Sequence, residues 1–468
     1  MTPNFRRKEE RELIKKFEKD LKNRVNQYYD LDQLEKIVNY YLDRGKDHKA
    51  LQACDYGLKH WPLSIELMLS KAQLLVDKGS FGPALALLEK ARDIQPYDYE
   101  INFLRANVLS MQGKHLDAIE AFKELLPLST DKDEIYYSIG LAYQNAADYP
   151  NAIEAYKEAI DINVNHESAL YELAYCLDIN GELEGSLSYY KKFIDKDPYS
   201  YIGWYNLGIV YNKLEQYKQA VEAYEYALAI NENFPSAHFN LGNTFMSLED
   251  YPKALNAYLK TIEIEGAGAE TYFSLAQVYE KMEYLDLALK YYGKAFKLDN
   301  FYDEAAYGIG LCLSSQEKWY EAIHFYNKAL KLDPDNEIYW LSTAEAEYKV
   351  GNVVSSLTAY REAALLNPND KSIWLNWSAI YYEQGNFQEA IDLIVKGLEE
   401  NPGESSLYYR AVVYFMANGK YKEAFNYLEQ ALIINFENHQ ELFDFFPKLE
   451  SQKALFKIID QYRKEKPE

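Results

Sequence analysis

Small and bulky apolar residues recur along this chain with a period of 34 residues. One register holds ten alanines and two serines, with no insertion or deletion between them. Its members are Ala50, Ala84, Ala118, Ala152, Ser186, Ala220, Ala254, Ala288, Ala322, Ser356, Ala390 and Ala424. The register fills residues 31–438 with twelve units, which begin at residues 31, 65, 99, 133, 167, 201, 235, 269, 303, 337, 371 and 405. A fixed period of this length predicts a stacked repeat array, in which each unit packs mainly on its neighbours.

Other positions of the unit predict a pair of helices. Counted from the first residue of each unit, position 8 is Gly, Ala or Ser in ten of the twelve units, and position 27 is small in nine. Position 24 is bulky, with Tyr in seven successive units from Tyr156 to Tyr360. Small residues let two helix axes approach closely, and the large residue fills the remaining space. Position 15 is Gly in seven units, as a helix C-terminus favours. The unit is therefore expected to be helix, tight turn, helix, turn.

The sixth unit carries a known pattern in order, with Trp204, Leu207, Gly208, Tyr211, Ala220, Tyr224 and Ala227. On these residues the chain resembles the tetratricopeptide repeat (TPR) family, over residues 31–438. The resemblance implies an all-α fold, an α-solenoid that winds as a right-handed superhelix. It also implies that the first helix of each unit lines a concave groove and the second lies outside. Members of the family are typically adaptors that hold partner proteins and have no catalytic activity of their own.

The two ends of the chain are expected to cap the array. Residues 1–30 should form a basic amphipathic helix, because residues 1–26 hold nine Lys or Arg, five Asp or Glu and a row of apolar residues. The row is Leu13, Phe17, Leu21 and Val25. Covering the apolar end of the first repeat is one role; docking to an acidic partner or another copy, and binding a membrane surface, are the alternatives. Residues 439–468 are expected to form C-terminal capping helices, separated near Pro447.

Composition narrows the partners. The formal net charge is −23 and the isoelectric point is near 4.9, which argues against nucleic acid, since a phosphate-binding surface needs concentrated Lys and Arg. Cys54, Cys176 and Cys312 are far apart and form no CxxC pair, which indicates buried thiols in a reducing compartment. The chain has no run of ~18 apolar residues and no apolar signal core, so we expect no integral membrane segment and a cytoplasmic location.

The central units present the best candidate for a partner surface. Family members tend to turn positions 2, 5, 6, 9, 12 and 13 toward the concave side, and units six and seven have no carboxylate there. Position 5 stays aromatic over seven units, and aromatic anchors concentrate binding energy at ~2 kcal/mol or more. Side-chain amides can bond a peptide backbone. The predicted groove residues are Tyr171, Tyr205, Asn206, Ile209, Asn212, Phe239, Asn240, Asn243, Phe273, Gln277 and Tyr307. The alternative is that these residues are ordinary family background.

The expected partner is a protein or peptide segment held in this groove. Five glutamates at the groove rim would favour a basic segment: Glu66, Glu100, Glu134, Glu270 and Glu304. Those residues also begin helices, where the helix dipole by itself favours a negative charge. A second hypothesis is a self-associating assembly platform that acts through its end helices, as a homo-oligomer.

The competing class of function is an enzyme, and few residues of the sequence support it. The seven histidines are scattered over different units without metal-ligand spacing. Glu321 and His324 form a single ExxH pair, whereas a di-metal carboxylate site needs a second pair and two more glutamates. We therefore expect no catalytic residues, no metal and no cofactor.

Overall fold

The computed structural model describes residues 3–23, 27–445 and 453–465. These residues form 27 α-helices and two short 3-10 helices, and they contain no β-strand. The chain divides into two compact bodies, Met1–Thr244 and Phe245–Glu468, each with hydrophobic clusters of its own. The all-α fold expected from the repeat pattern is confirmed.

The helix bounds follow the 34-residue register. The first body contains α1 (Pro3–Lys22), α2 (Leu31–Leu42), α3 (Asp47–His60), α4 (Ile65–Asp77), α5 (Phe81–Ile94), α6 (Tyr99–Met111), α7 (His115–Leu125), α8 (Lys132–Asn145), α9 (Tyr149–Ile162), α10 (Glu167–Ile179), η1 (Leu183–Gly185), α11 (Ser186–Lys196), α12 (Tyr201–Lys213) and α13 (Tyr217–Ile230). The boundary between the bodies falls within α14 (Pro235–Ser247). The second body contains α15 (Tyr251–Glu265), α16 (Ala269–Lys281), α17 (Leu285–Leu298), α18 (Asp303–Ser315), α19 (Trp319–Leu332), α20 (Glu337–Lys349), α21 (Val353–Leu366), α22 (Lys371–Glu383), α23 (Phe387–Glu400), α24 (Ser405–Ala417), α25 (Tyr421–Ile434), η2 (Glu437–His439), α26 (Gln440–Phe445) and α27 (Lys453–Glu465).

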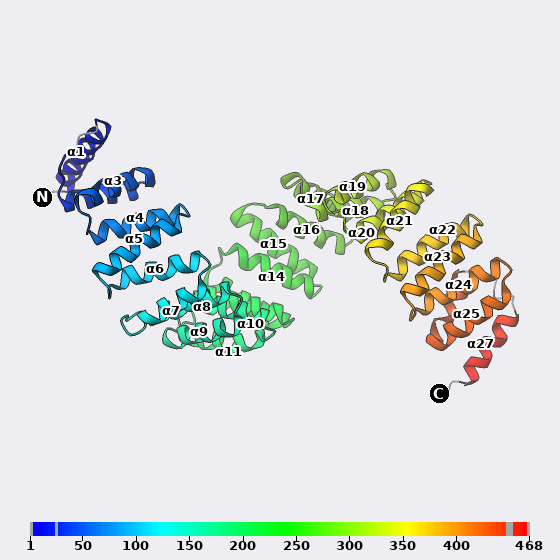
Figure 1. The fold of residues 1–468 in the computed structure, drawn as a ribbon. Helices are drawn as coiled ribbons and strands as arrows, with labels where there is room; N and C mark the ends of the chain where they lie inside the picture. The colour runs from blue at the N-terminus through cyan, green and yellow to red at the C-terminus, as the bar shows by residue number, and fades with distance from the viewer. Residues whose placement is uncertain (1–2, 24–26, 446–452, 466–468) are drawn as a thin grey trace. The chain divides into compact units, whose positions relative to one another are not determined.

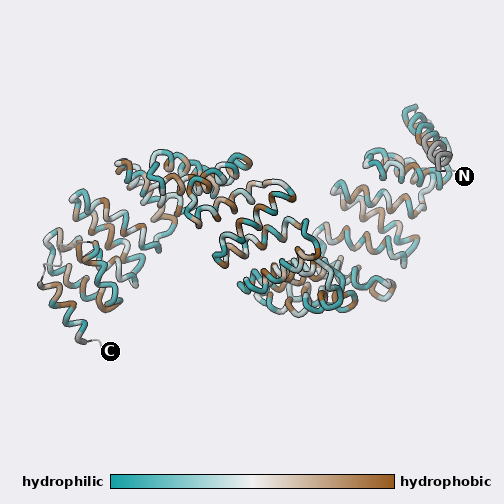
Figure 2. The backbone as a smooth tube through the Cα atoms, turned by 180° about the vertical axis from the view of Figure 1, so that it is seen from behind, coloured by the Kyte–Doolittle hydropathy of each residue, from teal (hydrophilic) through white to brown (hydrophobic). Residues whose placement is uncertain are grey.

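Consecutive helices form antiparallel pairs within each body, α2 to α13 in the first and α16 to α25 in the second (Figure 1). The first helices of successive pairs begin 34 residues apart, except α8, which begins one residue early at Lys132. Along every pair, apolar residues alternate with polar ones at short intervals, because one side of each helix is buried (Figure 2). The number of repeat units and the right-handed superhelix stay predictions.

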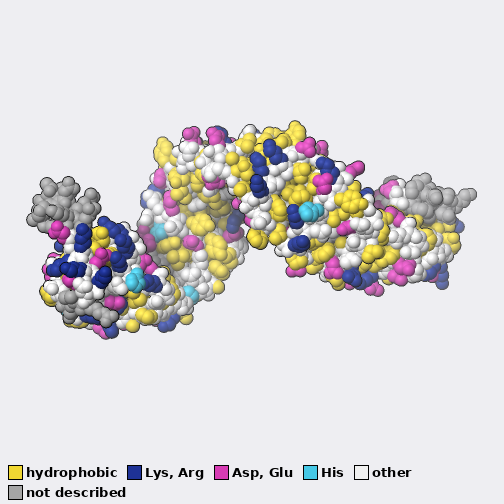
Figure 3. Space-filling view, turned by 90° about the horizontal axis from the view of Figure 1, so that it is seen from above, with side chains coloured by type: hydrophobic (Ala, Val, Ile, Leu, Met, Phe, Trp, Pro, Cys, Tyr) yellow, Lys and Arg dark blue, Asp and Glu magenta, His cyan; other side chains and the backbone are white. Residues whose placement is uncertain are grey.

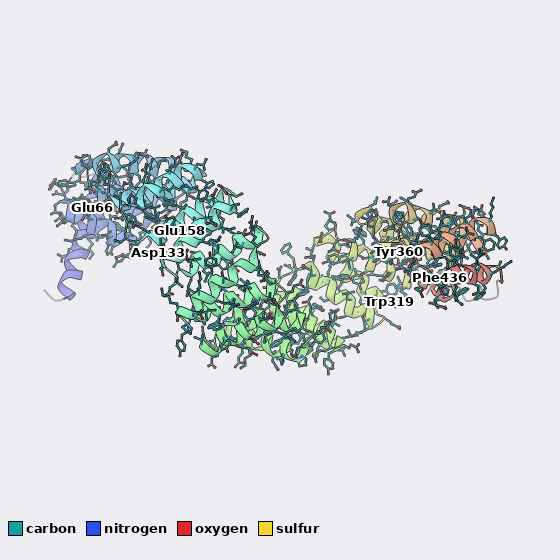
Figure 4. The ribbon with its side chains drawn as sticks, turned by 90° about the horizontal axis from the view of Figure 1, so that it is seen from below. Glu66, Asp133, Glu158, Trp319, Tyr360 and Phe436 are labelled. Carbon is teal, nitrogen blue, oxygen red and sulfur yellow. The ribbon has the colours of Figure 1, made fainter. Side chains whose placement is uncertain are left out.

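The small residues of the register lie where the paired helices approach most closely. All twelve alanines and serines at position 20 are fully buried. At position 8 the contact is tighter still, because a Cβ added to Gly208 would lie 2.6 Å from Cε1 of Tyr224. Tyr224 is the position-24 residue of that unit, and Tyr360 in Figure 4 is its counterpart on α21. The core is therefore packed as expected, with a large residue of one helix filling the space beside a small residue of its partner helix.

Helix α1 packs on the first helix pair. Phe17 is fully buried, with ring centroids 5.5 Å from Tyr29 and 5.6 Å from Tyr56, and Ile14 lies in the same cluster. The carboxylate of Glu18 accepts a hydrogen bond from Lys49 Nζ at 2.6 Å. The apolar row of this helix thus faces α2 and α3. Its expected last member, Val25, lies outside the described residues.

Helices α26 and α27 bury apolar side chains against the last repeat helices. Leu442 and Phe443 of α26 and Leu455 and Ile459 of α27 belong to the cluster that also contains α24 and α25. The break expected near Pro447 lies outside the described residues.

The three cysteines are free and buried. Burial raises the pKa of the Cys54 and Cys312 thiols to about 12 and that of Cys176 to about 11, so they stay protonated and unreactive. Within the described ranges, none of the helices combines the length and apolar composition that crossing a membrane requires.

Candidate functional site

A hollow of about 100 Å³ opens between α10, η1, α11 and α12 in the first body. Its lining is mostly apolar and aromatic, with one amide and one lysine: Tyr171, Ala174, Tyr175, Leu183, Tyr190, Asn206, Ile209, Val210 and Lys213. The predicted groove residues Tyr171, Asn206 and Ile209 therefore lie together in one site. We call this site the α10–α12 hollow.

The hollow exists because the second helix of this unit is broken. Helices α3, α5, α9 and α13 run for 14 residues, but here a 3-10 turn, η1, precedes an α11 of only 11 residues. Helix α7 also has 11 residues, but it starts at the usual register position and ends early, at Leu125, so its first turn is not broken. Gly185 and Ser186, which have lower helix propensity than alanine, stand at the break, and Ser186 Oγ donates to the carbonyl of Leu183 at 2.7 Å. Leu183 and Tyr190, on either side of the break, become part of the wall of the hollow.

Two tyrosines of α10 stand exposed at its edge. Tyr171 is 53% exposed and Tyr175 is 44% exposed. In the next unit the equivalent of Tyr171, Tyr205, lies against Phe234 with ring centroids 4.8 Å apart. The residue equivalent to Phe234 after Tyr171 is Ser200, whose Oγ caps α12 instead. Tyr171 makes no ring contact with a described residue, so its face is open to a partner.

Asn206 is the polar group of the hollow. Its side chain is only 8% exposed and has no hydrogen-bond partner among the described residues. The equivalent residue in the next unit, Asn240, donates from Nδ2 to the hydroxyl of Tyr205 at 3.0 Å. By the same spacing Asn206 would meet Tyr171, but that bond is not made. Asn206 therefore presents a donor and an acceptor to whatever enters the hollow.

Charged groups at the rim are already engaged. Lys213 and Asp178 form an ion pair across α12 and α10. Glu172, at position 6 of the same unit, accepts from Gln144 Nε2 at 2.8 Å. The lining of the hollow therefore consists of aromatic and apolar surface, one amide and one lysine that is already paired. No group of three or more His, Cys, Asp or Glu in the described part of the chain could hold a metal ion.

The other predicted groove residues of the first body are not in the lining of the hollow. Asn212 accepts a hydrogen bond from Thr244 Oγ1 at 3.3 Å. Tyr205 is half-buried, and desolvation is the largest cause of its raised pKa. Phe239 and Asn243 are half-buried on α14, and each interacts with neighbouring residues. Partner binding at these positions stays a prediction.

Phe273, Gln277 and Tyr307 belong to the second body. The ring of Phe273 lies 4.9 Å from that of Tyr302, and the hydroxyl of Tyr307 lies 2.9 Å from Ser342 Oγ. Gln277 is exposed. The two aromatic residues thus contribute to the repeat core, and their binding role also stays a prediction.

Sequence reasoning missed several walls of the hollow. Tyr175 stands at position 9, which the concave-face rule already includes, so the signal for it was present. Leu183 and Tyr190 carry no such signal, because they reach the hollow only through the break at η1.

Comparison with known families finds repeats of one kind. Models described as tetratricopeptide repeat match residues 69–133, 137–201, 189–222, 269–302, 304–336, 341–405 and 380–439, and one described as TPR repeat matches residues 210–248 and 242–283. Together these matches span nearly all of residues 69–439. No curated protein matches the chain.

Several solved structures are similar to this chain. YrrB, described as a TPR protein with an unusual peptide-binding site, is 21% identical over 40% of this chain and 96% of its own, with a TM-score of 0.35. The APC/C hetero-tetramer Cut9–Hcn1 is 15% identical over 85% and 96%, with a TM-score of 0.38. MamA is 29% identical over 35% and 95%, with a TM-score of 0.32.

Proposed function

The chain belongs to the tetratricopeptide repeat family, and we propose that it is a non-catalytic scaffold that holds a segment of a partner protein in the α10–α12 hollow. A protein-interaction scaffold is the general role that its repeats support. The aromatic lining of the hollow and its amide support this site for that role.

Asn206 is the observation that carries the proposal. Its amide lines the hollow and makes no hydrogen bond to another described residue. A peptide backbone that enters the hollow supplies a C=O for the amide N–H and an N–H for the amide oxygen. The backbone groups would then take the place of water at the amide, so an extended segment is favoured over an apolar small molecule, which offers it no hydrogen bond.

The aromatic edge supplies the remaining affinity. Exposed Tyr171 and Tyr175 flank an apolar floor that includes Ile209 and Val210. Anchoring residues of this kind contribute about 2 kcal/mol or more each at an interface. We infer that the segment places one bulky apolar side chain on this floor while its backbone meets Asn206.

A basic segment fits the charge of the molecule. The excess of 23 negative charges attracts cations over long range. The rim glutamates give weaker support, because Glu66, Glu100 and Glu134 stand in the first turns of α4, α6 and α8, where the helix dipole accounts for them. A reducing compartment such as the cytoplasm suits three buried free thiols.

Selection from a displayed peptide library on the full chain tests the proposal. Peptides selected on the wild type should bind Tyr171→Ala and Asn206→Leu at least about tenfold more weakly, as the loss of one anchor predicts. Photocrosslinking from position 175 should label the same peptides. Tyr97→Ala, which removes a tyrosine that is 82% exposed away from the hollow, is the matched control and should bind like the wild type. Peptides that bind all three variants equally would move the binding surface elsewhere.

A further inference from the structure

Two second helices of the first body and two of the second body carry opposite net charges. Helices α7 and α9 of the first body each have three acidic residues and one lysine. In the second body, α17 has three lysines and one aspartate, and α19 has two lysines and one glutamate. Two adjacent second helices with a positive balance stand out in a chain whose net charge is −23.

The opposite charges occupy the same positions of the repeat. Positions 22 and 26 of two successive units are Glu120, Glu124, Glu154 and Glu158 in the first body, and Lys290, Lys294, His324 and Lys328 in the second. We call the first set the acidic face and the second the basic face. Because both faces lie on helices one unit apart, their charges have matching spacing along and across the helices.

The basic face holds its ammonium groups in place. Lys294 Nζ lies 4.8 Å from the ring centroid of Tyr272 and 4.7 Å from that of Tyr291. Lys328 Nζ lies 4.4 Å from the ring centroid of Phe325. No ion pair with another described residue engages Lys290, Lys294, His324 or Lys328. Lysines ordered on aromatic rings lose less side-chain entropy when they meet an anion.

The acidic face is equally accessible. Glu120 and Glu158 are exposed and form no ion pair within the described chain, and Figure 4 labels Glu158 on α9. Glu154 pairs with Lys157 on its own helix at 2.8 Å, and Glu124 pairs with Arg92 at 3.4 Å. Exposed ion pairs of this kind contribute little to stability, so these glutamates can leave them to pair with a cation on another molecule. Figure 3 shows that like-charged side chains gather in places on the surface.

We propose that the basic face of one molecule binds the acidic face of a second copy of this chain. The match in sign, repeat position and spacing points to another copy rather than to an unrelated anion. Such a contact joins two different surfaces, so it leaves one face free at each end and continues into longer assemblies as concentration rises. Charge dominates it, so salt weakens it.

This contact uses neither the end helices nor any residue of the α10–α12 hollow. Peptide binding and self-association are therefore separate properties, and variants of one leave the other unchanged. Failure of one proposal can be told from failure of the other.

Sedimentation velocity of the full chain is the first test. The wild type should show a weight-average mass that rises with protein concentration at low salt and returns to the monomer value near 1 M salt, where charges are screened beyond about 3 Å. A monomer at every concentration and salt level would overturn the proposal.

Charge exchange is the second test. Lys290→Glu with Lys328→Glu removes the positive balance of the basic face, and Glu120→Lys with Glu158→Lys cancels the negative charge of the acidic face, so each double variant alone should stay monomeric. A mixture of the two should associate again, because each supplies the face that the other lacks. Lys396→Glu, at position 26 of α23, is the control and should associate like the wild type. A mixture that stays monomeric, with circular dichroism showing both variants folded, would refute the contact.

Discussion

At the scale of single residues, the turn inside each helix pair shows how strictly the repeat imposes a conformation. Position 15 has a positive φ in every unit, between 57° and 82°. Gly occupies it in seven units, but Ala147, Glu215, Glu249, Glu283 and Glu317 adopt the same left-handed conformation without being glycine. For a residue with a Cβ this conformation costs roughly 1–2 kcal/mol. The packing of the two helices therefore determines the backbone conformation of the turn, whichever residue occupies position 15.

Glycine at one of these strained turns should stabilise the chain. Glu215 has a φ of 57°, so Glu215→Gly should raise the free energy of unfolding by about 1 kcal/mol, because relief of strain exceeds the added chain entropy. Urea denaturation of the full chain measures the change. Glu222→Gly, the same substitution inside α13, is the control and should lower stability by about 1 kcal/mol. Equal effects of both substitutions would contradict the strain.

At the scale of elements, the break between η1 and the short α11 contributes Leu183 and Tyr190 to the hollow, and α1 closes an apolar core at the N-terminal end of the array. Helix α1 contributes Ile14 and Phe17 to the apolar cluster of the first repeat. In the other repeats, the neighbouring repeat helices supply the equivalent side chains. The first repeat of an array has no preceding repeat, so its apolar face is exposed unless another helix covers it.

Truncating the anchor of α1 should loosen the first repeat alone. Phe17 is fully buried, so Phe17→Ala should cost about 3–5 kcal/mol of local stability. Hydrogen exchange should accelerate in α1 to α3 and stay unchanged in α24 and α25, since repeats are coupled mainly to their neighbours. Lys15→Ala, at an exposed position of the same helix, should change neither. Uniform acceleration along the chain would show that the array unfolds as one unit.

At the scale of the whole molecule, the buried position-24 tyrosines make stability depend on pH. Burial raises the pKa of the Tyr224, Tyr292 and Tyr326 hydroxyls far above the ordinary value of 10.0. Their neutral forms are therefore favoured in the folded chain, whereas the unfolded chain releases the same protons near pH 10.0.

Alkaline unfolding should follow from this row. Above pH 10.0 the unfolded state binds fewer protons than the folded state, so stability is full below that pH and falls as pH rises above it. Tyrosinate absorbance should rise in two steps, first for exposed tyrosines and then, together with loss of helical circular dichroism, for the buried ones. Titration of all tyrosines in one step with the helices intact would contradict the prediction.

Sequence alone determined the repeat and its packing, because period, small residues and bulky residues are local properties that every unit restates. The alanine and serine register is buried throughout, as a crossing point of helices requires. The site was predicted only in part. The concave-face rule pointed to the residues at positions 5 and 6. That rule, however, assigns Tyr171 and Asn206 the same roles as Tyr205 and Asn240.

Tertiary structure decided the difference between those two pairs. Asn240 donates a hydrogen bond to Tyr205, whose ring contacts Phe234. In the preceding unit Ser200 replaces the phenylalanine, so Tyr171 lacks that ring contact, and Asn206 makes no hydrogen bond to another described residue. The break at η1 then opens the space that Asn206 faces. A contact between neighbouring units depends on three residues at once and on the helix that carries them, and no single position in the sequence records that combination.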